Sequence, residues 1–264
     1  MKNILVPIGS INNAVNTLQY AIDFASDIDA KIYVIHVYGV TKAASSMKNI
    51  DRFLEEDSKH ELEEVLNKVE KKEVEIISKA IKGNIVDSIE RVAKQLNVDL
   101  IISSAKSISV DEKVYLGKVT GGLIKHTKLP VLVIPKNYKF KKVSKILMAI
   151  KSGFISSSNV LSPLKIFVNK YNSNLELIRV ITPNSTSKDA QLNEELDALK
   201  KSYKTTENAT IFQGVLEHLH EADPDMLCVI RRKRGFFKRI REDDRIYKND
   251  FESRVPVLVL KGAI

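Results

Sequence analysis

The sequence lacks any run of about 18 apolar residues, the length that a helix needs to cross a membrane. No membrane span is therefore expected in its 264 residues. The stretch Met1–Asn13 has too short an apolar segment for a signal peptide and no small-residue cleavage site, so it is interpreted as a first strand. The only cysteine, Cys228, cannot form an intrachain disulfide, which fits a reducing cytoplasm. Its place in the apolar run Met226–Ile230 favours a buried core thiol over a catalytic one.

Catalytic and metal-binding patterns are also missing. No serine lies in a Gly-x-Ser-x-Gly turn. The five histidines are scattered, and His218 and His220 are two residues apart, so they do not share a helix face. No metal-ligand spacing results. A protein without catalytic turnover is expected, although slow ATP hydrolysis stays open.

The net charge of +9 permits attraction to nucleic acid, anionic lipid or acidic proteins, but selects none of them.

An internal repeat is the strongest positive signal. Lys2–Ser10 (KNILVPIGS) resembles Lys145–Gly153 (KILMAIKSG), and Lys128–Lys136 (KLPVLVIPK) resembles Arg254–Gly262 (RVPVLVLKG). The length suits two domains of about 130 residues. We therefore expect one unit over residues 1–137 and a second, degenerate unit over residues 142–264.

Strand and helix patterns alternate through the first half. Continuously apolar strands are expected at Ile4–Ile8, Lys31–Tyr38, Glu73–Ala80, Asp99–Ser103 and Pro130–Pro135. Helical spacing separates them, including a long amphipathic helix over Asp51–Lys72 and a helix over Val119–His126. Such strands are typical of parallel sheets covered on both faces, so each half is predicted to be a doubly wound α/β unit of five strands.

The second half is predicted to repeat this order. Strands are expected at Lys145–Ile150, Leu175–Ile181, Ala209–Phe212, Asp225–Ile230 and Val255–Leu260. Helices are expected over Val160–Tyr171 and Asp189–Tyr203, followed by a shortened helix between Gly214 and His220. The stretch 136–143 is basic and polar and is taken as the linker.

Ligands of open parallel sheets bind beyond the carboxyl ends of the strands. In the first half these ends are Pro7–Ile11, Val37–Val40 and Ser103–Ser107. Gly117 then opens a helix, whose free N–H groups and positive dipole end are features that accept phosphate.

Five features of the first half are specific: ILVPIGS at the start, IHVY ending the second strand, Gly83, DLIIS, and LGKVTGGLIKHTKLPVLVIPK. With these features, and with the repeat in the second half, the chain resembles the universal stress protein family. The resemblance implies an adenine-nucleotide α-hydrolase-like fold, with the two units packed as a pseudo-dimer through strand five. It also implies a cytoplasmic, stress-associated protein that acts through conformation and partners.

The family's nucleotide-binding members carry Gly-x2-Gly-x9-Gly-Ser/Thr after strand four. Those positions fall on Ser104, Ser107, Gly117 and Lys118, so the spacing is kept but one glycine of three remains. Gly9 stands where these relatives have an acid near the nucleoside. The resemblance thus implies a weakened site for ATP or another adenine nucleotide, formed by Pro7, Ile8, Gly9, Val37, Ser104, Ser107, Gly117, Lys118, Val119 and Thr120.

The second copy has lost this pattern. Ile230, Lys233, Asp243 and Asp244 occupy the four motif positions, so no nucleotide is expected there. A basic segment with two phenylalanines replaces it, and its cations are Arg231, Arg232, Lys233, Arg234, Lys238, Arg239 and Arg241. This segment is either a contact for an anionic partner or a solvated loop, and nucleic acid is disfavoured because no known module for it is present. A homodimer of tandem chains is also expected.

Overall fold

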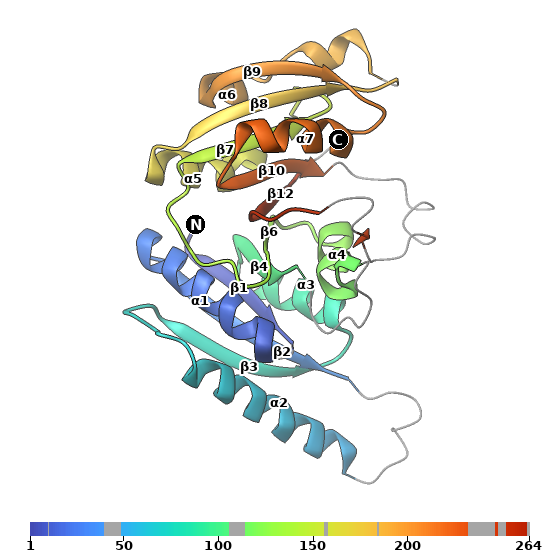
Figure 1. Ribbon diagram of the computed structural model, residues 1–264. Coiled ribbons are helices and arrows are strands. Elements are labelled where there is room, and N and C mark those ends of the chain that lie inside the picture. The colour runs from blue at the N-terminus through green and yellow to red at the C-terminus, as the bar shows by residue number, and fades with distance from the viewer. Residues whose placement is uncertain are drawn as a thin grey trace. The chain divides into compact units, whose positions relative to one another are not determined.

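Two α/β units make up the chain in the computed structural model, which describes residues 1–9, 11–39, 49–105, 114–155, 158–183, 185–231, 246–247 and 252–262 (Figure 1). One unit comprises Met1–Phe140 together with the short strand β11 (Ile246–Tyr247). The other comprises the rest of the described chain from Lys141 onward. We call them unit 1 and unit 2.

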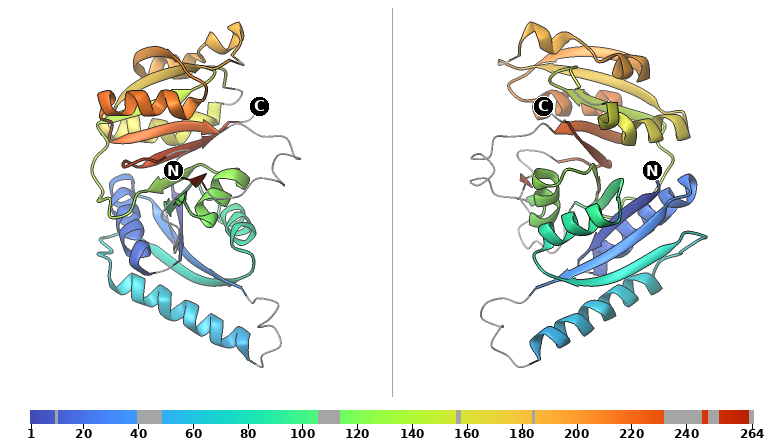
Figure 2. Two further views of the ribbon diagram at one scale, coloured as in Figure 1. Left: turned by 45° about the vertical axis from the view of Figure 1, so that its right-hand side comes forward. Right: turned by 180° about the vertical axis from the view of Figure 1, so that it is seen from behind.

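Unit 1 has a parallel five-stranded sheet in the order β3-β2-β1-β4-β6. Helices α1 and α2 cover one face and α3 and α4 the other, as right-handed crossovers require (Figures 1 and 2). Its strands are β1 (Asn3–Ile8), β2 (Lys31–Tyr38), β3 (Ile76–Lys82), β4 (Leu100–Ser104) and β6 (Val131–Ile134). Its helices are α1 (Ile11–Ile28), α2 (Ile50–Asn67), α3 (Ile85–Gln95) and α4 (Lys118–His126). A further strand, β5 (Val114–Leu116), pairs antiparallel with β11 directly before α4.

Unit 2 repeats this layout, with the parallel strand order β12-β10-β7-β8-β9. Its strands are β7 (Lys145–Ile150), β8 (Asn174–Ile181), β9 (Lys200–Glu207), β10 (Met226–Arg231) and β12 (Val257–Lys261). Its helices are α5 (Ser162–Tyr171), α6 (Glu194–Leu199) and α7 (Ile211–Ala222), with 3-10 turns η1 (Ser158–Leu161) and η2 (Ser187–Ala190). The doubly wound fold class expected from the sequence is confirmed in both halves.

Continuous apolar strands form the cores. Ile4, Leu5 and Val6 of β1 have no exposed surface, and neither do Ile146, Leu147 and Met148 of β7. Strands covered on both faces bury every side chain, which explains why these segments are apolar throughout.

Three expectations for the second half were wrong. The segment Asp189–Tyr203 is not one helix, because Asn193 caps α6 by accepting from two backbone N–H groups and the chain turns into β9 at Lys200. The expected strand Ala209–Phe212 instead contains the start of α7, where the Thr210 side chain accepts from the Gln213 N–H at 3.2 Å. Helix α7 has 12 residues and α3 has 11, so the helix is not shortened.

An aspartate before the fourth strand fixes the start of the first strand in each unit. Asp99 accepts the backbone N–H groups of Lys2 and Asn3 at 2.7 and 3.0 Å. Asp225 accepts those of Ser144 and Lys145 at 2.8 and 3.0 Å. This contact satisfies donors at a strand start that the sheet leaves unpaired.

The segment 136–143, expected to be a polar linker, also makes apolar contacts with unit 1. Tyr138 and Phe140 pack against Tyr20 of α1, with ring centroids 6.3 and 5.2 Å away. Tyr20 is 1% exposed, so these rings add to the core of unit 1.

Candidate functional site

The switch point of the unit 1 sheet lies between β1 and β4, where the order of the strands reverses. Only two residue pairs join these strands, Ile4 with Leu100 and Leu5 with Ile101. Pro7 lies beyond these pairs and has no N–H to extend them, although it stays in register with Ile35 of β2. The two strands are therefore not paired with each other toward their carboxyl ends, where a doubly wound fold places its ligand.

The expected nucleoside side of the site lies around this point. Ile8 ends β1 and is buried, whereas Gly9 follows it and is exposed. Val37 is half-buried near the end of the neighbouring strand β2. Pro7, Ile8, Gly9 and Val37 thus lie on the adjoining ends of β1 and β2, and none of them offers an acid to a sugar.

The expected phosphate side is the start of α4. Lys118 is its first residue and is exposed, and Val119 beside it is half-buried. Gly117 caps the helix in an extended conformation with φ of −65°, so its backbone does not require glycine. Its N–H donates to the Ala105 carbonyl at 3.0 Å and is already used within the fold.

Thr120 ties this helix to the end of β4. Its hydroxyl donates to the Ser104 carbonyl oxygen at 2.7 Å and lies 2.9 Å from the hydroxyl of Ser103. Both Thr120 and Ser103 are buried. Thr120 therefore holds α4 against the sheet, while Ser107, the remaining predicted residue, lies outside the described residues.

The matching edge of unit 2 is closed in two ways. Four residue pairs join β7 to β10, from Ile146–Met226 to Ala149–Val229, because Ala149 replaces the proline. Beyond them, a Cβ added to Gly153 would lie 2.4 Å from the Gln191 carbonyl oxygen. The chain after β8 thus fills the space at the end of β7. The expectation that this copy holds no nucleotide stays a prediction.

Backbone bonds hold this closure together. The Gly153 N–H donates to the Asp189 carbonyl at 3.1 Å, and the Asn193 N–H donates to the Gly153 carbonyl at 3.0 Å. Ser152 beside them is buried and accepts from the Phe154 N–H at 3.3 Å.

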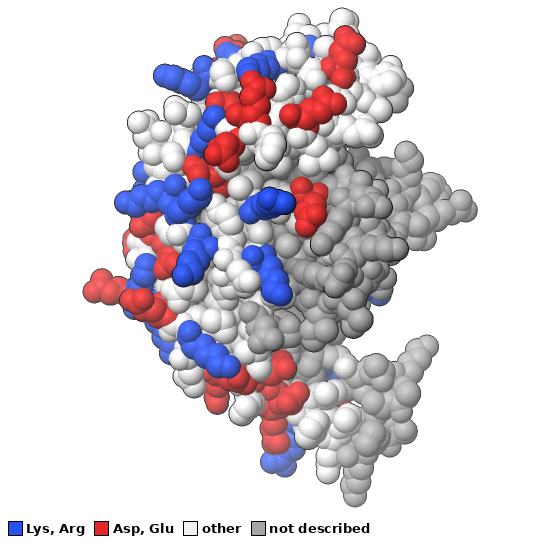
Figure 3. Space-filling view, in the orientation of Figure 1, with Lys and Arg blue, Asp and Glu red and all other residues white. Residues whose placement is uncertain are grey.

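The basic segment contributes one described residue, Arg231 at the end of β10; its other cations lie outside the described residues. Among the described residues in the view of Figure 3, basic and acidic side chains are interspersed. The contact with an anionic partner therefore stays a prediction.

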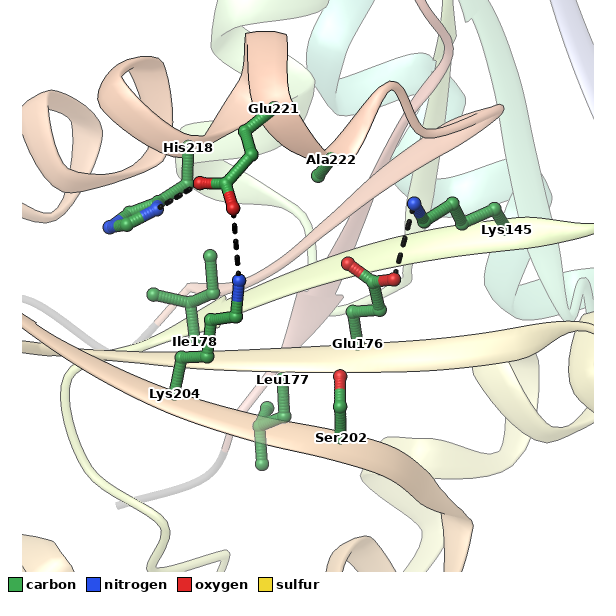
Figure 4. A pocket seen from close by; sticks show the side chains of 9 residues that line it. All are labelled: Lys145, Glu176, Leu177, Ile178, Ser202, Lys204, His218, Glu221 and Ala222. Carbon is green, nitrogen blue, oxygen red and sulfur yellow. Dashed lines mark hydrogen bonds and ion pairs between the residues drawn. The ribbon is translucent and has the colours of Figure 1, made fainter.

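A polar hollow of about 180 Å³ lies in unit 2, under the carboxyl end of α7 and near the amino ends of β7 and β8 (Figure 4). Lys145 pairs with Glu176 at 3.2 Å, and Glu221 pairs with Lys204 at 3.3 Å and lies 3.7 Å from His218. These groups neutralise one another, and the hollow is at the opposite end of the strands from the expected ligand edge.

Sequence reasoning missed the unequal pairing of the two switch points. The sequence repeat, which sets Lys2 against Lys145, places Pro7 opposite Ile150, whereas the strand bounds place it opposite Ala149. Within the described residues, no cluster of three or more histidine, cysteine, aspartate or glutamate residues could hold a metal ion. No helix of the described chain is long and apolar enough for a membrane span.

The fold defines the chain as a tandem α/β protein of the adenine-nucleotide α-hydrolase-like class. The model of the universal stress protein family matches residues 1–135, and the chain belongs to this family. No curated protein matches it.

Solved structures resemble both units together. A universal stress protein from Archaeoglobus fulgidus DSM 4304 is 22% identical, with a TM-score of 0.71, over 98% of this chain and 96% of that chain. A functionally unknown protein from Pseudomonas aeruginosa PAO1 is 16% identical, with a TM-score of 0.62, over 99% and 92%. A universal stress protein in complex with cAMP aligns with 52% of this chain and 98% of its own, at 16% identity and a TM-score of 0.42.

Proposed function

We propose that the chain is a cytoplasmic, stress-associated binding protein of the universal stress type, acting through conformation and partners rather than turnover. The observation that carries this proposal is that polar groups at the start of α4 are hydrogen-bonded within the fold. The Thr120 hydroxyl and the Gly117 N–H both bond to the end of β4, so they serve the fold. Groups held in this way stabilise a conformation and are not free to stabilise a transition state.

Phosphate release from magnesium ATP tests this proposal. We expect the wild-type protein and a Lys118→Ala variant to release phosphate at the same rate as buffer. A release rate that scales with wild-type concentration and drops in Lys118→Ala would show turnover at the start of α4 and overturn the proposal.

A second candidate function is adenine-nucleotide binding in unit 1. The carboxyl ends of β1 and β4 support it, because the pairing between these two strands stops at Leu5 and Ile101. The positive end of α4 and the exposed Lys118 supply charge that suits a phosphate.

Calorimetry with ATP tests the second candidate, using Lys128→Ala as the matched control because Lys128 is exposed at the far end of α4. We expect millimolar or tighter binding, weakened about fivefold to tenfold in Lys118→Ala and unchanged in the control. No heat of binding at millimolar ATP would refute this candidate and leave the first proposal standing.

A further inference from the structure

His36 lies between the unit 1 sheet and α2, and both of its ring nitrogens contact that helix. Nδ1 meets the hydroxyl oxygen of Ser58, and Nε2 lies 3.1 Å from a carboxylate oxygen of Glu61. A carboxylate only accepts, so Nε2 carries the hydrogen that Glu61 accepts, and Nδ1 of the neutral ring accepts from Ser58. The neutral ring therefore satisfies both partners at once.

Serine, histidine and glutamate also act together in the active sites of hydrolases. Burial of Ser58 and His36 excludes a catalytic role here. Ser58 is 1% exposed, and the His36 side chain is 15% exposed. The Ser58 hydroxyl faces the ring from inside the packed interface between α2 and β2, where no substrate can reach it. The cluster therefore acts on the position of α2 rather than on a bound molecule.

The repeat supplies an internal comparison. Ile8 at the end of β1 is in register with His36, and Ile150 at the end of β7 is in register with Arg179. The second unit thus carries a permanently charged side chain where the first carries a histidine, whose charge depends on pH. Helix α6, which follows β8, corresponds to α2.

We propose that His36 is a pH-sensitive attachment of α2: protonating its ring on acidification loosens α2 from β2, while α6 of unit 2 is unaffected. The protonated ring donates from both nitrogens. The buried Ser58 hydroxyl must then accept from Nδ1 and turn its own hydrogen away from the ring. The charge must also be held in a site that is largely closed to water.

The charges that face His36 come from α2. Burial has the largest effect and lowers the pKa of His36 below its ordinary value, although Glu61 and Asp57 favour the charged ring. The neighbours in register on β1 and β3, Ile8 and Ala80, carry no charge.

Toward the amino end of α2, Lys82 of β3 is paired with Asp51 of that helix at 2.6 Å. This cation is neutralised by its own partner, so the acids on α2 remain the main counter-charges of the ring.

The sign of the pH effect follows from linkage. A histidine whose pKa is lower when folded binds fewer protons in the folded state than in the unfolded state. The contribution of His36 to the stability of the folded state is complete above about pH 6.5. It is lost as the pH falls from there toward the pKa of the folded protein. Loosening would expose the apolar face of the sheet that Leu62 and Val65 of α2 now cover, since both are buried.

Amide hydrogen exchange of the full chain between pH 7.5 and 5.0, with each rate divided by its intrinsic rate, tests this proposal. We expect the protection of α2 to fall by up to about tenfold for each unit by which the pKa of His36 is lowered. Protection of α6 should stay constant. In His36→Gln the fall should vanish, whereas the control His60→Gln, on the exposed side of α2, should retain it.

Flat protection of α2 in the wild type, or a fall that persists in His36→Gln, would overturn the proposal. If His36→Gln does not fold, Glu61→Gln replaces it. Removing the carboxylate should lower the pKa of His36 further and deepen the fall at pH 5.0. An NMR titration of the His36 ring with a midpoint at or above 6.5 would also contradict it.

Discussion

Replacing Asp225 by asparagine should remove one of the strongest polar contacts in unit 2. Its carboxylate accepts the N–H groups of Ser144 and Lys145 and the Lys141 ammonium, which is 2.5 Å away. Burial alone raises the pKa of Asp225, but the hydrogen bonds from Lys141, Ser144 and Lys145 outweigh it and lower the pKa from 3.8 to about 2. A shift of this size corresponds to about 2 kcal/mol of stability at neutral pH.

We therefore expect Asp225→Asn to lower the free energy of unfolding by about 2–3 kcal/mol at pH 7, because the amide loses the ion pair and turns a donor toward donors. Urea unfolding followed by circular dichroism measures this, since the chain has no tryptophan. The folded pKa is depressed, so the contribution is present above about pH 4 and is lost as the pH falls toward 2.

The matched control is Asp223→Asn, which removes the same charge from an exposed residue with φ of 39°, a conformation that asparagine accepts. It should change stability by less than about 0.5 kcal/mol. If the two variants unfold at the same urea concentration, or if the deficit of Asp225→Asn is as large at pH 2 as at pH 7, the reasoning is refuted.

Other substitutions test the closure of unit 2 and the anchoring of α4. Gly153→Ala should cost about 1–3 kcal/mol in urea unfolding, because the new Cβ meets the Gln191 carbonyl oxygen at 2.4 Å; an unchanged midpoint would contradict the closure. Ala149→Pro should destabilise by more than about 1 kcal/mol, since Ala149 is paired with strands on both sides; full tolerance would contradict that pairing. Thr120→Val should cost about 1–2 kcal/mol through the lost hydrogen bond to β4, and no loss would mean that the hydroxyl does not anchor α4. Burial raises the pKa of the Cys228 thiol, so a thiol reagent should label it only in denaturant, and rapid labelling of the native protein would contradict its burial.

The sequence was sufficient to predict the doubly wound units, because buried parallel strands are continuously apolar. It misled at β9, whose residues Lys200–Glu207 are mostly polar and lie at the edge of the sheet. The helix predicted over Asp189–Tyr203 therefore ran into the first residues of this strand. Pairing with β8, a contact between distant residues, makes the segment a strand, and composition does not report such contacts.

The sequence predicts a place for the candidate site, and whether a nucleotide binds there stays a prediction. The spacing from Ser104 to Lys118 correctly brings the start of α4 to the end of β4. Whether a hydroxyl is free or already bonded depends on packing, and Thr120 is bonded to a carbonyl 16 residues away. The closure at Gly153 likewise depends on its contact with Gln191. No local sequence pattern indicates that these two residues lie close together.

The central claim is that the second copy of the scaffold closes its own ligand edge. Amide exchange of Gly153 and Asn193, measured by NMR with and without ATP, tests it most directly, because both N–H groups bond across the closure. The account predicts slow exchange that ATP does not change. Exchange of both amides at the rate of an unstructured peptide, or a slowing on addition of ATP, would contradict it.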